Sequence, residues 1–181
     1  MVLEYSLDKP DFLECQLFIA SKSERVIKSR RKARLVVPIT YLILGLLLFL
    51  FTDIVFTLIF ITIGLIWYLY YPYYIRKRYV RHFEKALAES YKNRFGKLSL
   101  LKFGEEIIEI TDYIGETKIR IQEIEEINEI KNYLFLKLSS GESLIIPKDK
   151  IKEENEFRHY ISMLTERFYI KYNVELNWKW R

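Results

Sequence analysis

One stretch of the chain, residues 35–71, constrains the fold more than any other. It contains 29 hydrophobic side chains in 37 positions and a single charged residue, Asp53. As one helix it would be about 55 Å long, well beyond the hydrocarbon core of a bilayer at about 30 Å. Cut at Asp53, it becomes two pieces of 18 residues, each about 27 Å long as a helix and just sufficient to cross. The sequence therefore predicts a transmembrane helical hairpin formed by residues 35–52 and 54–71.

Basic residues gather on both sides of this apolar block. They are Lys22, Arg25, Lys28, Arg30, Arg31, Lys32 and Arg34 before it, and Arg76, Lys77, Arg78, Arg81 and Lys85 after it. Only Glu24 and Glu84 oppose these twelve, whereas the rest of the chain carries 17 basic and 22 acidic residues. An excess of Lys and Arg beside a span marks its cytoplasmic side. We therefore expect a multi-pass protein of the cytoplasmic (inner) membrane with both termini in the cytoplasm, and no nucleic-acid partner.

The flanking charges also predict a contact with anionic lipid head groups. The candidate residues are Lys28, Arg30, Arg31, Lys32, Arg34, Arg76, Lys77, Arg78 and Arg81. Each such charge near an anionic surface is worth about 1 kcal/mol, and salt screens the attraction. The plainer interpretation is that these residues only set the topology.

Three features in the block or just after it concern the turn, the packing and the end of the two helices. Asp53 falls at the turn, where its carboxylate can cap the second helix. An intramembrane ion or proton site is the alternative, but the block holds no second ionisable residue as its partner. Gly45 and Gly64 can let the helices approach closely. The second span ends in aromatic residues typical of a membrane interface, which are Trp67, Tyr68, Tyr70, Tyr71, Tyr73 and Tyr74.

The segments beside the hairpin predict short helical elements. Residues 1–34 predict a strand at Val2–Ser6 and then an amphipathic helix that starts at Asp8-Lys9-Pro10 and continues into the basic flank. The apolar face of this helix either lies on the lipid interface or docks on the C-terminal domain, and the few basic residues there favour docking. Residues 72–97 predict a basic cytoplasmic linker helix that ends near Gly96.

The pattern of residues 98–181 changes to strands. Alternation predicts strands around 98–100, 108–110, 114–121, 124–130, 133–138 and 143–146, followed by a helix at 151–168. Strands followed by one helix indicate an α+β fold with an antiparallel, strongly bent sheet or barrel that the helix closes at one end. The tail from Val174 to Arg181 alternates like a strand, and it either covers a sheet edge or anchors at the interface through its two tryptophans.

The chain resembles the YcxB-like family of small bacterial membrane proteins. The similar segments are Glu4-Tyr5-Ser6-Leu7, Asp11-Phe12-Leu13-Glu14, Tyr70-Tyr71-Pro72, Arg76-Lys77-Arg78-Tyr79, Gly115-Glu116-Thr117-Lys118-Ile119, Ile124-Glu125-Glu126-Ile127, Leu136-Lys137-Leu138 and Ile145-Ile146-Pro147-Lys148. They extend over nearly the whole chain and are most specific between residues 106 and 148. The resemblance implies a C-terminal domain similar to bacterial pleckstrin-homology-like domains, without a catalytic motif.

A search for chemistry in the sequence gives little. His82 and His159 have no neighbours at metal-ligand spacing. We expect Cys15 to be a packing residue rather than a lipidation site. No phosphate-loop, dinucleotide or hydrolase motif occurs. The carboxylates Glu123, Glu125, Glu126 and Glu129 predict a solvated face, because nothing in the pattern buries one of them. We expect no enzyme, no catalytic residues, no metal and no cofactor.

Binding is the function that remains. Phosphoinositide capture by the first hairpin loop is disfavoured, because Gly104-Glu105-Glu106 is acidic. We expect a membrane-anchored, cytoplasm-facing scaffold or sensor module that contacts the bilayer and either a protein partner or a second copy of itself. The alternative is a small oligomeric pore or transport accessory. A pore needs polar residues along its path, and residues 54–71 contain few beyond Thr57 and Thr62.

Overall fold

The computed structural model describes residues 1–50, 54–90 and 94–180. The chain forms two compact units. The sheet unit consists of Met1–Cys15 and Glu84–Lys179, and the helical unit consists of Gln16–Phe83 together with Trp180. Segments from both sides of the apolar block therefore fold into one unit. Asp53, which we expected at the turn between the spans, lies outside the described residues.

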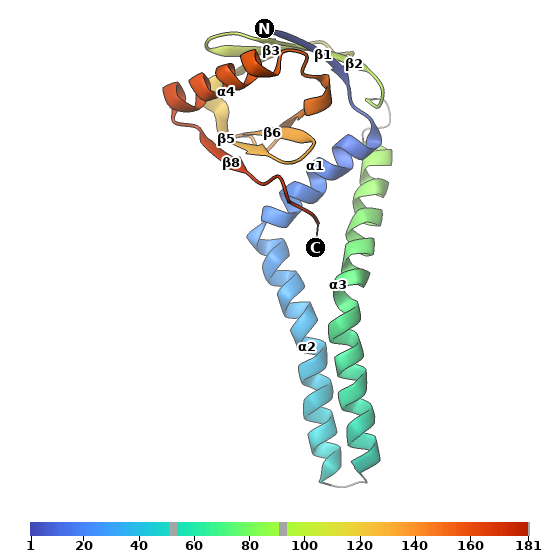
Figure 1. Ribbon diagram of the computed structural model, residues 1–181. Helices are drawn as coiled ribbons and strands as arrows, with labels where there is room; N and C mark the ends of the chain where they lie inside the picture. Colours follow the sequence, from blue (N-terminus) through green and yellow to red (C-terminus); the bar gives the residue numbers. More distant parts are fainter. Residues whose placement is uncertain (51–53, 91–93, 181) are drawn as a thin grey trace. The chain divides into compact units, whose positions relative to one another are not determined.

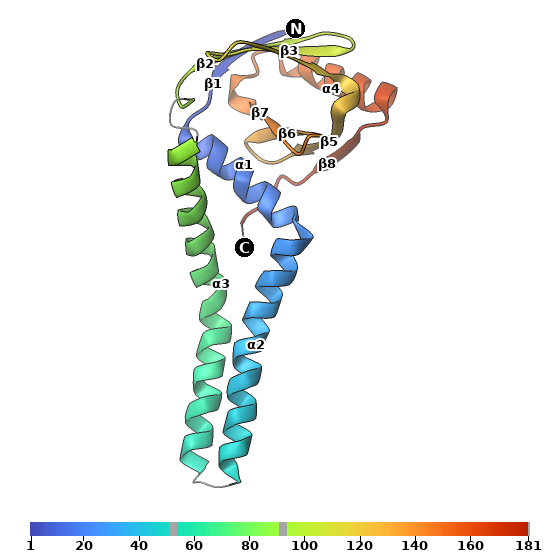
Figure 2. The same cartoon turned by 180° about the vertical axis from the view of Figure 1, so that it is seen from behind.

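The helical unit contains α2 (Glu24–Phe49) and most of α3 (Ile54–Ser90). Figures 1 and 2 show the two helices side by side. Both are long and apolar enough to cross a membrane, and only 6% and 17% of their most apolar windows are buried. The core helix of a soluble protein would be mostly buried, so the exposed apolar side chains indicate a membrane association.

One helix boundary differs from the expected one. The N-terminal helix does not continue through the basic flank, because α1 (Lys9–Lys22) ends at Ser23, whose extended backbone separates it from α2. The second span and the linker helix form one continuing helix, as the sequence predicted, since α3 passes through Pro72 without interruption. The loss of one backbone hydrogen bond at a proline is tolerated in long apolar helices.

Two glycines bring α2 and α3 together, as the sequence predicted. A Cβ atom on Gly45 would lie 3.4 Å from Cβ of Phe60, and one on Gly64 would lie 3.4 Å from Cα of Pro38. The buried Thr57 hydroxyl donates a hydrogen bond of 3.1 Å to the Gly45 carbonyl. Small residues and a satisfied hydroxyl are what packing between apolar helices requires, because apolar side chains gain little by leaving lipid.

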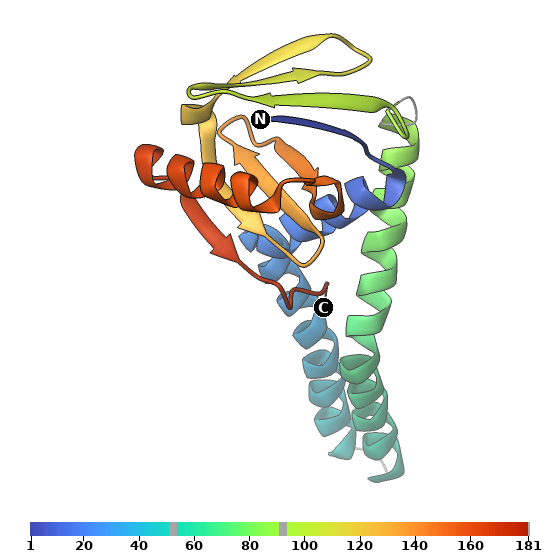
Figure 3. The same cartoon turned by 45° about the horizontal axis from the view of Figure 1, so that its top comes forward.

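The sheet unit contains eight strands and α4 (Glu154–Phe168). The strands are β1 (Val2–Ser6), β2 (Leu98–Phe103), β3 (Ile107–Thr111), β4 (Glu116–Arg120), β5 (Ile124–Glu129), β6 (Tyr133–Leu138), β7 (Ser143–Pro147) and β8 (Lys171–Val174). They form two four-stranded sheets in the orders β1-β2-β3-β4 and β7-β6-β5-β8. A short 3-10 helix, η1 (Ile121–Glu123), connects β4 to β5, and a second one, η2 (Lys148–Lys150), follows β7. Figure 3 shows the two sheets with α4 beside them.

The α+β class is therefore correct, but the expected single antiparallel bent sheet or barrel is not found, because the described strands form two sheets that do not close. The described sheets are separate, because η1 carries the chain from β4 to β5 without a ladder between those strands. The second sheet is also mixed, since β8 pairs with β5 in parallel. The strand expected at 174–181 lies earlier, at Lys171–Val174, where it covers the edge of β5.

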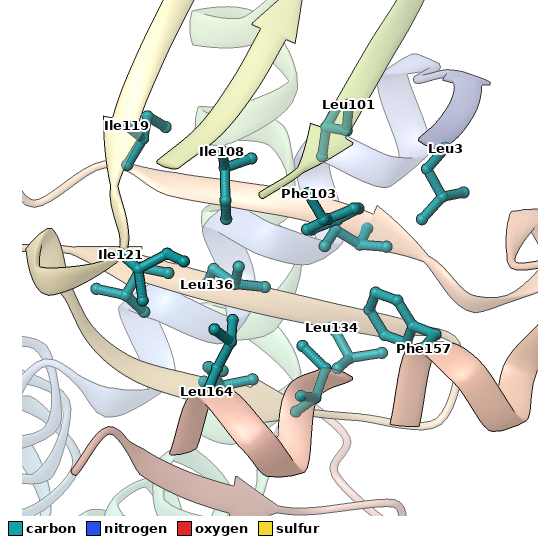
Figure 4. Packing of buried hydrophobic residues seen from close by; sticks show 14 of the residues in the cluster. Leu3, Leu101, Phe103, Ile108, Ile119, Ile121, Leu134, Leu136, Phe157 and Leu164 are labelled. Atoms are coloured by element: carbon teal, nitrogen blue, oxygen red, sulfur yellow. The ribbon is translucent and has the colours of Figure 1, made fainter. Parts of the chain in front are cut away.

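The core lies between the two sheets and α4. Figure 4 shows Leu101 and Ile108 from the first sheet, Leu136 from the second, and Phe157 and Leu164 from α4 pointing into one cluster. All five are at most 2% exposed. The ring of Phe157 packs edge-on against Phe103 at 5.8 Å. Burial of such side chains stabilises a fold by about 1.5–3 kcal/mol each.

The N-terminal segment belongs to this core. β1 pairs antiparallel with β2, with Val2 opposite Lys102 and Ser6 opposite Leu98. In the first half of α1, Asp11 accepts a hydrogen bond of 2.6 Å from the Tyr133 hydroxyl, and Cys15 is 3% exposed. The docking of this helix on the C-terminal domain and the packing role of Cys15 are thus confirmed, and burial raises the pKa of the Cys15 thiol to about 12.

A conservative substitution tests the bridge between the two sheets. The buried Tyr5 hydroxyl of β1 donates a hydrogen bond of 2.7 Å to the carbonyl of Ile145 on β7. Tyr5→Phe leaves that carbonyl unsatisfied, so we expect a loss of about 1–3 kcal/mol in the free energy of unfolding. Urea unfolding of the full chain in detergent measures it. Tyr113→Phe, at a residue that is 48% exposed, is the control and should change little; equal effects would contradict the bridge.

A second prediction concerns the glycine contact of α2 and α3. Gly64→Leu would drive a branched side chain into Pro38 and Tyr41, so we expect a clear drop in the thermal stability of the helical circular-dichroism signal in detergent. Gly64→Ala is the matched control, because its Cβ fits at ordinary contact distance and Ala favours a helix by about 1 kcal/mol over Gly. If both variants melt like the native chain, close packing at Gly64 is not important.

Candidate functional site

The most unusual polar residue of the sheet unit is Glu129, at the end of β5. Side chains on a strand alternate between faces, so Glu129 shares a face with the fully buried Ile127. Glu129 is itself only 4% exposed. The sequence interpretation that placed this carboxylate on a solvated face is therefore wrong. It overlooked that Glu129 lies on the face of β5 that carries the buried Ile127, where α4 brings Arg158 to the carboxylate.

Three side chains from three other elements contact the Glu129 carboxylate. The Lys148 ammonium of η2 donates a hydrogen bond to Oε1, and the Tyr172 hydroxyl of β8 donates one to Oε2. The Arg158 guanidinium of α4 lies 3.7 Å from Oε1. Four elements distant in sequence thus converge on one carboxylate.

The electrostatics of this cluster keep Glu129 ionised. Burial by itself raises the pKa of the Glu129 carboxyl, because it disfavours the charged form. The hydrogen bonds from Lys148 and Tyr172 and the positive charges of Lys148 and Arg158 outweigh this, so the pKa is lowered overall. Burial raises the pKa of the Tyr172 hydroxyl, and its hydrogen bond to Glu129 raises that pKa further. A saturated carboxylate of this kind holds its neighbours in position and has no proton to donate at neutral pH.

A pocket of about 650 Å³ opens beside the cluster. Its lining comes from β5, β6, η2, α4, β8 and the segments around them: Glu129, Lys131, Leu134, Lys148, Asp149, Ile151, Glu154, Phe157, Arg158, Ile161, Ser162, Thr165, Tyr172 and Leu176. The α4 residues in this set recur at three- and four-residue spacing and so share one helix face. Ligand pockets commonly measure about 300–1,000 Å³ and combine apolar walls with a few polar groups. The pocket fits this description.

The predicted lipid-contact residues lie in the helical unit. Lys28, Arg31, Lys32, Arg76, Lys77, Arg78 and Arg81 are exposed, whereas Arg30 and Arg34 are half-buried. Arg30 lies over the Trp180 ring at 4.7 Å, and Arg34 lies over the Tyr68 ring at 4.1 Å. Because Arg34 of α2 is level with Tyr68 of α3, the basic residues of both helices are at the same end of the hairpin. We call these nine residues the basic collar.

Some of the collar charges have partners within the chain. Lys28 forms an exposed ion pair of 2.8 Å with Glu24 one turn earlier, and exposed pairs of this type are worth well under about 1 kcal/mol. The Trp180 ring that Arg30 covers also packs against Tyr79 at 5.4 Å. Arg30 and Arg34 are thus occupied by aromatic rings, and the exposed members are the ones available to a head group.

The other chemical candidates from the sequence remain apart. His82 and His159 are both exposed, and no group of three potential metal ligands occurs within the described residues. Glu125 forms a surface ion pair of 2.9 Å with Lys137. Sequence patterns did not identify Lys148, Arg158 or Tyr172 as members of a site. The sequence held one sign that Glu129 is buried, which is its position two residues after Ile127 on the same strand face. It held no sign of the three partners, because they are distant in sequence.

Comparison with known families gives one result. Residues 103–161 match the family model described as YcxB-like protein. Over this range the chain is similar to the YcxB-like family. The resemblance predicted from the sequence is confirmed over that range, which begins at the end of β2 and ends within α4. The YcxB-like segment includes Glu129, Lys148 and Arg158, whereas Tyr172 lies after it. No curated protein and no solved structure matches the chain.

The lowered pKa of Glu129 predicts how stability depends on pH. Because the folded-state pKa is below the ordinary value of 4.5, the contribution of ionised Glu129 is present above that pH and is lost as the pH falls through the folded-state pKa. We expect Glu129→Gln to cost about 1–3 kcal/mol at neutral pH, and the difference from the native chain to shrink in acid. Urea unfolding across this pH range measures it.

The control for this prediction is Glu123→Gln, because Glu123 is exposed on η1. Its stability should follow the native pH dependence. A constant difference between Glu129→Gln and the native chain from neutral to acid pH would contradict the ionised cluster.

Proposed function

We propose that the chain is a membrane-anchored binding module, in which α2 and α3 cross the bilayer as a hairpin and the sheet unit is cytoplasmic. The observation that carries the proposal is the composition of the sheet unit. It contains Met1–Cys15 from before the hairpin and Glu84–Lys179 from after it. A folded unit occupies one side of a bilayer, so both ends of the hairpin must return to that side.

The surface of the helices supports the same orientation. Large apolar residues of both helices are exposed along the part of the hairpin away from the basic collar, such as Leu46, Leu47, Leu58 and Leu65 at 51–57%, and lipid is the solvent that suits them. The basic collar lies at the end where the chain enters and leaves. Its excess of Lys and Arg favours the cytoplasm for that end, and its exposed members are suited to attract anionic head groups.

Within this proposal the sheet unit is the part that binds. Its two sheets and following helix are compatible with a pleckstrin-homology-like relationship, although the sheets do not close. β4, at the edge of its sheet, has four of its five residues exposed, and such an edge can accept a strand from a protein partner or from a second copy. We propose a scaffold or sensor role without catalysis, because cations and a hydroxyl already saturate the Glu129 carboxylate. We also propose no nucleic-acid partner, because the excess of basic residues lies beside the hairpin.

The alternative of an oligomeric pore receives less support. A conducting path needs polar groups along the span. In the described part of the hairpin, the Thr57 hydroxyl bonds the Gly45 carbonyl between the helices, and the Thr62 hydroxyl bonds the Leu58 carbonyl of its own helix at 2.7 Å. These hydroxyls satisfy the backbone and leave little to line a pathway. Ion flux in liposomes that contain the purified chain would favour the pore.

Reporter fusions test the topology. A reporter that is active only outside the cytoplasm should be silent when fused before residue 1 or after residue 181, and active when inserted next to Asp53. Activity at either terminus would refute the cytoplasmic sheet unit. Replacement of the exposed arginines Arg31, Arg76 and Arg78 by Gln should weaken the orientation preference, because these charges resist translocation; the same change at Arg120, Arg158 and Arg167 should not.

A further inference from the structure

The pocket beside Glu129 brings apolar side chains of the core together with the charged groups around Glu129. Its deep wall is apolar and consists of Leu134, Phe157 and Ile161, which are 2–4% exposed. At the mouth, Leu176 is 50% exposed, so an apolar side chain borders the opening. A ligand with an apolar body would remove the exposed part of Leu176 from water, at a gain of about 25 cal/mol for each Å² buried.

Two cations lie side by side at the polar end of the pocket. Lys148 and Arg158 both lie within 4.0 Å of the same Glu129 oxygen. Glu129 neutralises one of the two cations and holds both in place, which leaves one positive charge in the cluster. The carboxylate of Glu154, which pairs with Arg158 at 2.8 Å, has a side chain that is 66% exposed, and water and salt screen such a pair strongly. Lys131 adds a further cation to the lining, and Asp149 adds a further carboxylate, which is 69% exposed and pairs with Lys150 at 3.1 Å.

A purely structural role for the cluster would be to tie β5, η2, α4 and β8 together. That role explains the contacts of Glu129, but it does not explain a pocket of about 650 Å³ with apolar walls at the same place. The juxtaposition of the cations with an open apolar cavity calls for an occupant with both properties.

We infer that this pocket binds a small amphipathic anion, whose carboxylate or phosphate ester head contacts Lys148 and Arg158 and whose apolar chain lies along Leu134, Ile161 and Leu176. The inference rests on the proposed binding function of the sheet unit and names its ligand class. Charge-assisted hydrogen bonds from Lys and Arg are short and strong with such heads. Glu129 acts as a positioning residue that keeps the two donors side by side.

Equilibrium dialysis of the full chain in lipid nanodiscs tests the inference, with octanoate as the probe and empty nanodiscs as the blank. Octanoate has a carboxylate head and a short chain, so it stays largely in water. Hexyl phosphate tests the phosphate head, inorganic phosphate tests the head alone, and octyltrimethylammonium reverses the charge. We expect saturable binding of octanoate or hexyl phosphate, and none of inorganic phosphate or the cationic amphiphile.

Two pairs of variants on α4 locate the site. Arg158→Gln removes a head-group donor, and we expect about tenfold weaker binding. Its control is Arg167→Gln, because Arg167 is also an exposed arginine of α4 with an acidic neighbour, at 3.7 Å, but does not line the pocket. Ser162→Phe fills the cavity and should abolish binding, whereas His159→Phe, an exposed α4 residue outside the lining, should bind like the native chain.

The outcomes separate the two proposals. Saturable binding that Arg158→Gln and Ser162→Phe reduce and their controls retain would support the ligand class. No saturable binding of either anionic amphiphile, equal effects of Arg158→Gln and Arg167→Gln, or a preference for the cation would overturn it. None of these results changes the reporter test of membrane topology, so failure of the ligand class and failure of the anchored module are distinguishable.

Discussion

The pairing of β1 with β2 is the interaction on which the rest of the structure depends. Val2–Ser6 comes before the apolar hairpin and Leu98–Phe103 comes after it, yet they form one antiparallel ladder. The buried Tyr5 hydroxyl then connects this ladder to the second sheet through Ile145. The helical hairpin is thus an insertion between neighbouring strands of one folded unit, and its two open ends are joined through that unit.

Glu129 shows how a domain without a catalytic arrangement can still contain a chemically specific site. Burying an unpaired carboxylate is costly, and the cost is met here by a lysine, a tyrosine and an arginine from separate elements. Removing any one partner leaves a charge that the others must accommodate. The cluster therefore fixes the positions of η2, α4 and β8 relative to β5, and with them the walls of the adjacent pocket.

Local patterns predicted the individual elements well. The alternation in Tyr133–Leu138 gave β6 at its observed bounds, and the turn at Ser139–Glu142 contains Gly141 with a positive φ of 87°. The two glycines of the hairpin also lie at the helix contact. Each of these signals depends on a few consecutive residues, or on one small residue in an apolar helix, and such signals are visible in a single sequence.

Predictions failed where the outcome depends on residues distant in sequence. The pattern of Lys171–Val174 does not say that it pairs in parallel with β5, and alternation cannot show that η1 separates two sheets rather than bending one. Glu129 was assigned to solvent because acidic neighbours dominate its segment. Its burial follows from α4 and β8, whose positions arise only from tertiary packing.

The insertion of the hairpin also sets the order of events during synthesis. β1 precedes the hairpin in the chain, but it has no partner until residues 98–103 have been made, after both apolar helices. Domains generally fold as their chain emerges, and distant pairings form slowly because a long loop must close first. The first sheet can therefore be completed only when the second apolar helix has been synthesised, so every complete sheet unit already has both helices of the hairpin attached to it.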